Sequence, residues 1–181
     1  DLRRSRGLGD VYKRQSDCYL HRQTGEGLVF RNEVGSDMQG TLGVIKDFIE
    51  TRHGEDAFAG EGYMLSFENR HSLKDGPSAT VACSVLVDSV VSGIRLDPDF
   101  SVTGDLNHNG RVQVVGGIAA KLGAARSNGS TIVAIPWENR MAVCDALLLS
   151  GVGSITELQV VGAEIYEDAW RLAGLQKGPV L

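Results

Sequence analysis

DGPSATVACSVLVDSVVSG, residues 75–93, is the stretch that decides how this chain folds. Its first three residues favour a tight turn, and a nearly continuous apolar run follows them up to Gly93. An apolar run of this length with a glycine directly after it is typical of a buried helix, which Asp75 can cap and whose first turn suits Pro77. The sequence therefore predicts a central helix that presents Ser78 at its mouth.

Helix and strand patterns alternate outward from this segment toward both ends of the chain. Apolar residues at spacings of three and four predict amphipathic helices, whereas short β-branched or alternating runs between turn residues predict strands. The predicted helices are 38–54, with Thr41 as its N-cap, 75–93, 116–129, 141–151 and 164–174. The predicted strands are 27–34, 62–70, two short strands within 100–115 around a turn at 107–110, 130–136 and 157–161. This alternation indicates an α/β (α+β) fold in which helices pack on a mixed sheet.

The length, charge and cysteines limit what kind of protein this can be. A chain of 181 residues fits one domain, and a net charge of -5 disfavours nucleic acid as a partner because phosphate binding needs clustered Lys and Arg. The apolar runs fall short of the roughly 18 residues that span a bilayer, so we expect no membrane partner. Cys18, Cys83 and Cys144 have no C-x-x-C spacing and predict neither a disulfide framework nor a metal site. Cys83 and Cys144 lie in apolar stretches, where we expect small core residues.

The first fifteen residues differ in character from the rest of the chain. They hold five basic and two acidic residues without apolar periodicity, and we expect residues 1–15 to be a non-native, library-derived tail. Residues 16–26 are left unassigned, and the folded domain is predicted to cover 27–181. Because we expect the native N-terminus to be missing, the compartment stays open between the cytoplasm and the bacterial envelope or secretion.

Ser78 and Lys121 are the two residues whose surroundings favour chemistry. Lys121 falls in a helical stripe whose other members, at spacings of three and four, are apolar: Ile118, Leu122 and Ala125. Its stem can cover apolar surface while its amine reaches water. Alternatively, burial disfavours the ammonium and lowers the lysine pKa, which leaves a neutral amine able to deprotonate a serine. Ser78, turned tightly into its helix, is placed near backbone N–H groups that can hold an oxyanion.

Five motifs together resemble the proteolytic domain of the Lon protease family. They are GTLG at 40–43, KDGPSA at 74–79, VTGDLNHNGRV at 102–112, VGGIAAKLGAA at 115–125 and IPWEN at 135–139. The resemblance implies the compact α/β peptidase fold of that family and its catalytic Ser-Lys dyad, which Ser78 and Lys121 match at the separation that the family motif requires. It also implies supporting roles near the dyad: Thr103 for a hydroxyl that supports the lysine, and Asp75 for an aspartate beside the nucleophile. An ordinary β-branched strand residue explains Thr103 as well, and an ordinary N-cap explains Asp75. Gly76 and Pro77 are the residues of the tight turn before Ser78.

We therefore expect a serine endopeptidase that hydrolyses peptide bonds in unfolded or flexible polypeptides. Ser78 attacks the peptide carbonyl while neutral Lys121 takes the hydroxyl proton. The alternative is a catalytically silent domain of the same fold that serves assembly or partner binding. A histidine-based triad is disfavoured because His71 lies only seven residues before Ser78. The other three histidines lie in turn-like or polar stretches: His21, His53 and His108. No H-E-x-x-H helix predicts a zinc peptidase.

The chain also departs from the family pattern. Thr80 follows Ser-Ala where the family commonly has Gly, and Asp105 stands in place of the glutamate of T-G-E. The chain contains no G-x-x-x-x-G-K-[ST] phosphate loop, so we expect no cofactor in it, and ATP only if an ATPase module exists elsewhere. The resemblance implies a polypeptide substrate and a homo-oligomer, typically of six subunits.

Overall fold

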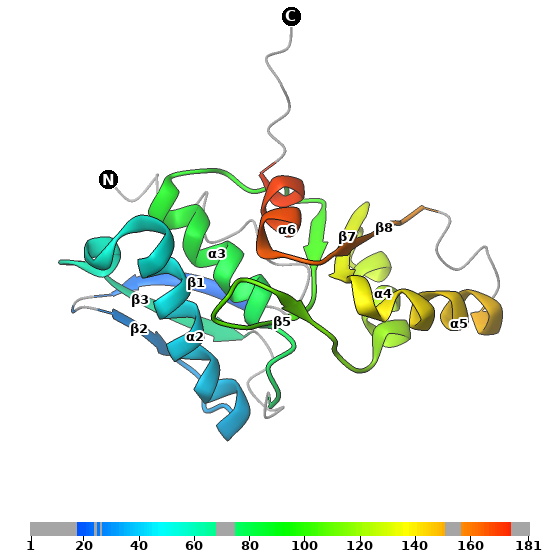
Figure 1. The fold of residues 1–181 in the computed structure, drawn as a ribbon, viewed down its shortest axis with the longest axis horizontal. Helices are drawn as coiled ribbons and strands as arrows, with labels where there is room; N and C mark the ends of the chain where they lie inside the picture. Colours follow the sequence, from blue (N-terminus) through cyan, green and yellow to red (C-terminus); the bar gives the residue numbers. More distant parts are fainter. Residues whose placement is uncertain (1–17, 24, 26, 68–74, 151–156, 175–181) are drawn as a thin grey trace, which may run out of the picture.

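The computed structural model describes residues 18–23, 25, 27–67, 75–150 and 157–174. These residues form two three-stranded sheets, a short hairpin and the helices packed around them (Figure 1). The α/β fold class predicted from the sequence is confirmed, although the strands are divided between two sheets. The predicted tail at 1–15, the end of the predicted strand at 68–70 and His71 lie outside the described residues. Among the described helices, none is both long enough and apolar enough to cross a membrane.

The first sheet is mixed and has the order β1-β3-β2. β1 (Cys18–Gln23) runs antiparallel to the central strand β3 (Gly62–Phe67), and β2 (Gly27–Phe30) runs parallel to it. The sequence did not predict β1, because only Cys18 and Leu20 of its six residues are buried and the local pattern is weak. Its backbone is ordered by pairing with β3, a partner more than forty residues away in the chain.

Two helices cover this first sheet and pack against each other. α2 (Ser36–His53) contacts β2 and is followed by the short helix η1 (Glu55–Phe58), while α3 (Thr80–Ser92) contacts β1. α3 is buried on every side, because all of its residues from 80 to 89 are buried. It ends at Gly93, which adopts a left-handed conformation with φ of 69° as the sequence predicted for the end of this helix.

The second sheet consists of three parallel strands in the order β4-β7-β8. They are β4 (Phe100–Val102), β7 (Ile132–Pro136) and β8 (Gln159–Ala163). α4 (Ile118–Ser127) leads into β7, and η2 (Trp137–Asn139) and α5 (Arg140–Ser150) lead from β7 toward β8. α6 (Tyr166–Ala173) follows β8 and packs on α3, whereas α4 and α5 lie away from the first sheet, at the right of Figure 1.

The segment 100–115 contains the predicted turn but only part of the predicted hairpin. β5 (Asp105–Leu106) pairs with β6 (Val112–Gln113), and the carboxamide of Asn107 accepts hydrogen bonds from the backbone N–H groups of Asn109 and Arg111 at 3.0 and 2.9 Å. The residues before this hairpin form β4 instead, because Phe100 and Val102 are apolar and pair with β7 in the buried parallel sheet.

The prediction that Asp75 caps α3 is wrong. α3 begins at Thr80, and its N-cap residue Ala79 has no side-chain cap. The Asp75 carboxylate instead accepts a hydrogen bond from the backbone N–H of Asp37, at the start of α2, at 3.3 Å. The N-cap residue of α2 is Gly35, which has no side chain that could cap the helix. The Asp75 side chain occupies the space beside Gly35, where a Cβ would lie 2.2 Å from the Asp75 Cγ.

Two further helix-end predictions are corrected by the structure. Thr41 lies inside α2, which begins at Ser36, and its hydroxyl donates to the Met38 carbonyl at 2.7 Å within the helix. Pro77 lies before α3, and its carbonyl accepts hydrogen bonds from both the backbone N–H and the hydroxyl of Thr80. Both errors arise because local propensity marks residues that suit a helix start without deciding where packing begins the helix.

The cysteines divide into a buried pair and an exposed residue. Cys83 is buried as predicted, and Cys18 lies beside it with 3.7 Å between the two sulfur atoms. The hydrogen bond with Cys83 and burial both raise the pKa of the Cys18 thiol well above its usual range. The prediction that Cys144 is a core residue is wrong, because Cys144 is exposed on α5. The apolar run of α5 covers both faces of that helix, and only one of them faces the protein.

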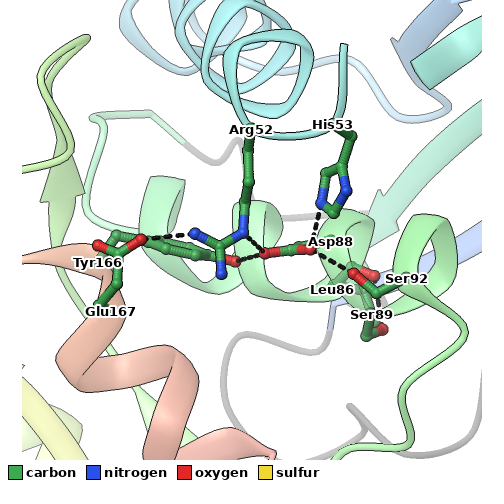
Figure 2. A network of polar contacts seen from close by, with 8 residues as sticks. All are labelled: Arg52, His53, Leu86, Asp88, Ser89, Ser92, Tyr166 and Glu167. Carbon is green, nitrogen blue, oxygen red and sulfur yellow. Dashed lines mark hydrogen bonds and ion pairs between the residues drawn. The ribbon is translucent and has the colours of Figure 1, made fainter. Parts of the chain in front are cut away.

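A buried carboxylate near the end of α3 connects three helices (Figure 2). Asp88 is fully buried, and its Oδ2 contacts Arg52 Nε at 2.9 Å and accepts a hydrogen bond from the Tyr166 hydroxyl at 2.8 Å. Its Oδ1 lies 2.7 Å from His53 Nε2 and accepts a hydrogen bond from the Ser92 hydroxyl at 2.7 Å. Arg52 and His53 end α2 and Tyr166 begins α6, so this one side chain joins α2, α3 and α6.

We predict that Asp88→Ala strongly destabilises the fold. The substitution removes the buried acceptor of the Tyr166 and Ser92 hydroxyls and leaves Arg52 with Glu167 as its remaining ion-pair partner. Loss of one member of a buried ion pair costs on the order of 3 kcal/mol. Equilibrium unfolding in urea, followed by circular dichroism, measures this loss. The matched control is Arg22→Ala, which breaks the exposed ion pair with Glu61 and should change the free energy of unfolding by less than about 1 kcal/mol. Equal losses in the two variants would contradict a central role for Asp88.

Candidate active site

A cavity of about 60 Å³ brings together the two residues that the sequence singled out. Such a volume has room for a few water molecules or a small polar group. It lies where the segment before α3 meets β4, α4 and β7, and it is lined by Ser78, Ala79, Val102, Thr103, Lys121, Leu122, Val133 and Ile135. Of these residues, three carry polar side chains: Ser78, Thr103 and Lys121. The site thus consists of two hydroxyls and one amine on an apolar wall.

Ser78 is held through its backbone by the segment that follows β4. Its carbonyl accepts a hydrogen bond from the Thr103 hydroxyl at 3.1 Å and another from the Gly104 backbone N–H at 3.0 Å. In return, the Gly104 carbonyl accepts from the backbone N–H of Val81 at 3.2 Å. This approach requires a glycine, because a Cβ at Gly104 would lie 2.8 Å from a methyl group of Val112. The position of Ser78 is therefore fixed relative to β4 and not by α3 alone.

The turn that carries Ser78 is also set by a positive backbone angle. Gly76 has φ of 85°, a conformation that residues with a Cβ rarely adopt, and its backbone N–H donates to the Asp75 carboxylate at 2.9 Å. The chain therefore turns sharply at Gly76, while the predicted supporting role of Gly76 at the site stays a prediction. Ser78 itself lies two residues before the first residue of α3, so it stands at the mouth of the helix and not within its first turn.

Lys121 projects from the apolar stripe of α4. Its stripe neighbours Ile118, Leu122 and Ala125 are buried and pack in a small core with β7, while Lys121 is half-buried. Its Nζ donates a hydrogen bond to the Gly116 carbonyl at 2.6 Å. Burial lowers the pKa of Lys121 below its ordinary value of 10.5. The sequence left open whether the Lys121 amine reaches water or is buried and neutral. In the structure the amine is partly desolvated and still reaches the surface.

Asn139 lies outside the cavity lining but binds the segment before α4, a contact that the sequence did not indicate. Its side-chain carbonyl accepts a hydrogen bond from the Val115 backbone N–H at 3.0 Å, and its amide nitrogen donates to the Val115 carbonyl at 2.9 Å. It thereby holds the residue before Gly116, whose carbonyl binds Lys121. In the sequence, Asn139 is a polar residue shortly after the end of a predicted buried strand, within the motif IPWEN. That pattern does not indicate which backbone groups the Asn139 side chain binds.

The remaining predicted site residues lie elsewhere or make other contacts. Asp75 is exposed and faces α2, and Pro77 contributes its carbonyl to Thr80. The hydrogen bond that the structure gives the Thr103 hydroxyl goes to Ser78, and its support of Lys121 stays a prediction. Of the described histidines, none lines the cavity: His21 lies in β1 beside Ser66, His53 contacts Asp88, and His108 is exposed near Asp47.

Comparison with known proteins identifies the family. The family model of the Lon protease (S16) C-terminal proteolytic domain matches residues 37–147, more than half of the chain. The chain belongs to the Lon proteolytic domain family. The matched range includes both sides of the cavity, from Ser78 through Thr103 and Lys121 to Asn139.

Several Lon proteases resemble this Lon domain in sequence. The Lon protease of Desulfovibrio desulfuricans is 42% identical over 123 residues, which is 62% of this chain and 13% of that protein. Lon protease 1 of Hydrogenovibrio crunogenus is 33% identical over 112 residues, 59% of this chain and 14% of that protein. Lon protease 2 of Bacillus subtilis is 38% identical over 69 residues, 38% of this chain and 12% of that protein. The chain therefore spans only about an eighth of the length of these relatives.

One departure of this Lon domain from the family pattern has a structural explanation. Thr80, where Gly is common in the family, is fully buried, and its hydroxyl donates to the Pro77 carbonyl at 2.6 Å. This bond reinforces the turn that presents Ser78. Asp105, which stands in place of the usual glutamate, lies in the hairpin strand β5 and accepts a hydrogen bond from the backbone N–H of Leu106 at 2.7 Å. Both replacements form local contacts outside the lining of the cavity.

Proposed function

We propose that this chain is a serine endopeptidase domain in which Ser78 is the nucleophile and Lys121 the general base. The observation that supports this proposal is the shared cavity: Ser78 and Lys121 come from different elements, and Lys121 is the one ionisable residue among those that line it. Burial of the amine favours its neutral form, which is the form that can accept a proton. The proposed substrate is unfolded or flexible polypeptide.

The hydrogen bond between Lys121 and Gly116 suits this role. A neutral amine has two N–H groups and one lone pair, and a carbonyl oxygen can only accept a hydrogen bond. The Gly116 carbonyl therefore binds an N–H of Lys121 and leaves the lone pair free for the Ser78 hydroxyl proton. As the Ser78 oxygen attacks the peptide carbonyl, Lys121 takes this proton and then gives it to the leaving amine.

Hydrolysis of the acyl-enzyme completes the cycle. Lys121, neutral again after protonating the leaving amine, removes a proton from water, and the resulting hydroxide attacks the ester carbonyl and releases Ser78 with its proton restored. The developing oxyanion in each half-reaction needs backbone donors. The N–H groups of Thr80 and Val81 already donate to Pro77 and Gly104, so the N–H of Ser78 or Ala79 is the donor we assign. Serine and lysine supply nucleophile and base, so this chemistry requires no metal ion or nucleotide.

We also propose that the domain associates with copies of itself. α5 presents apolar side chains that no described part of the chain covers: Met141 is 64% exposed and Leu148 83% exposed, and Trp137 just before the helix is 47% exposed. Exposed apolar side chains in one region are typical of interaction surfaces. The alternative to a peptidase, a catalytically silent domain that serves assembly, would use this same surface.

The dyad is tested by single substitutions. Ser78→Ala and Lys121→Ala should each lower the hydrolysis of casein or a fluorogenic peptide by about a thousandfold or more, because the members of a catalytic unit fail together. Lys46→Ala, which removes an exposed lysine from α2, is the control and should leave the rate unchanged. Casein degradation at the wild-type rate in Lys121→Ala would rule out the assignment, and an inactive wild-type chain would favour the silent alternative.

The pH dependence of kcat/KM tests the state of the lysine. Because the pKa of Lys121 is lowered, its amine is protonated and inactive below that pKa and becomes neutral as the pH rises through it. We expect kcat/KM to rise with pH along a limb whose midpoint lies below 10.5, and Lys121→Arg, which stays protonated, should remove the limb with the activity. A midpoint at or above 10.5 would contradict a partly desolvated base.

Self-association is tested by light scattering coupled to size-exclusion chromatography at several protein concentrations. The wild-type chain should show a mass above that of the monomer that grows with concentration. Leu148→Glu should reduce the mass, because a carboxylate cannot be buried in an apolar contact without a partner. Val29→Glu, on the distant strand β2 and also exposed, is the control. A wild-type monomer at every concentration would refute the proposal.

A further inference from the structure

The segment before α4 has little intrinsic rigidity, although it carries the carbonyl that binds Lys121. Gly116 and Gly117 are consecutive glycines outside any strand or helix, and both are exposed. Gly117 is the N-cap residue of α4 with φ of 69°, and a Cβ at either glycine would meet nothing within 4 Å. Glycine has more backbone freedom than any other residue, so contacts elsewhere must hold the Gly116 carbonyl in place.

Asn139 makes the contacts that restrain this segment. Its amide group binds both the N–H and the carbonyl of Val115, and it is buried, with 7% of its surface exposed. A primary amide offers a donor and an acceptor in one plane, which matches the N–H and carbonyl of a single extended residue. Val115 directly precedes Gly116, so Asn139 restrains the peptide group that lies next to the one carrying the Lys121 acceptor.

Asn139 is itself held firmly by the second sheet. It ends η2, directly after β7, whose residues Val133 and Ile135 form part of the cavity wall. In the same turn Trp137 packs on β8 at Gly162, where a Cβ would lie 2.5 Å from the indole ring. Arg140 directly follows Asn139 in the chain, and its guanidinium lies 5.1 Å from the centre of the Trp137 ring. These contacts connect the sheet to Asn139, then to Val115 and to Gly116.

We propose that Asn139 is a positioning residue for Lys121: through Val115 it fixes the Gly116 carbonyl, which in turn orients the lysine amine toward Ser78. This inference rests on the proposed function of the dyad. Without the two hydrogen bonds from Asn139 to Val115, which we call the Asn139 clamp, Gly116 and Gly117 gain backbone freedom. The Gly116 carbonyl then moves away from the Lys121 amine. The amine then gains water and loses its orientation, and a displacement of about 1 Å at a catalytic group can cost on the order of a hundredfold in rate.

Kinetics of two Asn139 variants test the proposal in the full chain. Asn139→Ala removes both hydrogen bonds, whereas Asn139→Asp has nearly the same shape and places a carboxylate against the Val115 carbonyl, where it repels instead of donating. In both variants we expect kcat for a fluorogenic peptide to fall between about tenfold and a hundredfold, with KM within about twofold of wild type. The rising limb of the pH profile should move to higher pH. Asn109→Ala, an exposed asparagine of the hairpin, is the control and should match wild type.

A second measurement does not depend on activity. In a chain labelled with 13C-lysine, the Cε signal of Lys121, identified by its loss in Lys121→Arg, reports the titration of the amine. Among the described residues that line the cavity, Lys121 alone is ionisable. We expect its midpoint to lie below 10.5 in wild type and to move toward 10.5 in both Asn139 variants, with no change in Asn109→Ala.

The outcomes separate this inference from the proposed function. If Asn139 serves stability alone, its variants melt at a lower temperature while the Lys121 titration, the pH limb and kcat stay at their wild-type values, and the positioning role is overturned. If Ser78→Ala and Lys121→Ala hydrolyse peptide at the wild-type rate, the dyad itself fails. If those two variants are inactive while the Asn139 variants behave as wild type, only the role of Asn139 is lost.

Discussion

Burial of the Asp88 carboxylate in α3 is the constraint on which the arrangement of the helices depends. A carboxylate in an apolar interior is stable only when charged or hydrogen-bonding partners surround it. Arg52 and His53 at the end of α2 and Tyr166 at the start of α6 supply these partners. α2 covers the first sheet and α6 follows the last strand of the second, so one buried side chain holds both halves of the chain around α3.

The same helix connects this network to the candidate active site. Asp88 lies near the end of α3, and Ser78 lies just before its start, so the position of the helix sets the position of the serine. The serine is then fixed from the other side, because Thr103 and Gly104 bind its carbonyl from the end of β4. Backbone hydrogen bonds have defined directions, and two of them on one carbonyl leave the peptide little freedom. Ser78 and Ala79 thus lie at a cavity whose other lining residues come from β4 and the residue after it, α4 and β7.

Membership of the Lon proteolytic domain family assigns the chain to a class of peptidases, while the structure accounts for particular residues. Family motifs include residues with quite different tasks. Ser78 and Lys121 line the cavity, whereas Asn139 and Gly104 act on neighbouring backbone, and Asp75 caps a helix distant in sequence. Thr80 shows how a departure from the motif is accommodated. Where the family commonly has glycine, the Thr80 hydroxyl donates a hydrogen bond to the Pro77 carbonyl inside the turn.

The sequence by itself indicated most of the elements and the two residues that we propose as the dyad, Ser78 and Lys121. The predicted boundaries of α2, α4, β7 and α6 agree with the structure within two residues, because periodic burial is encoded locally. The motifs around Ser78 and Lys121 indicated the proposed chemistry. Only the tertiary structure decided the pairing of β1, the partner of Asp75, the exposure of Cys144 and the clamp formed by Asn139. These features join residues far apart in the chain, and a local pattern shows which face of an element is buried but not which distant atom it meets.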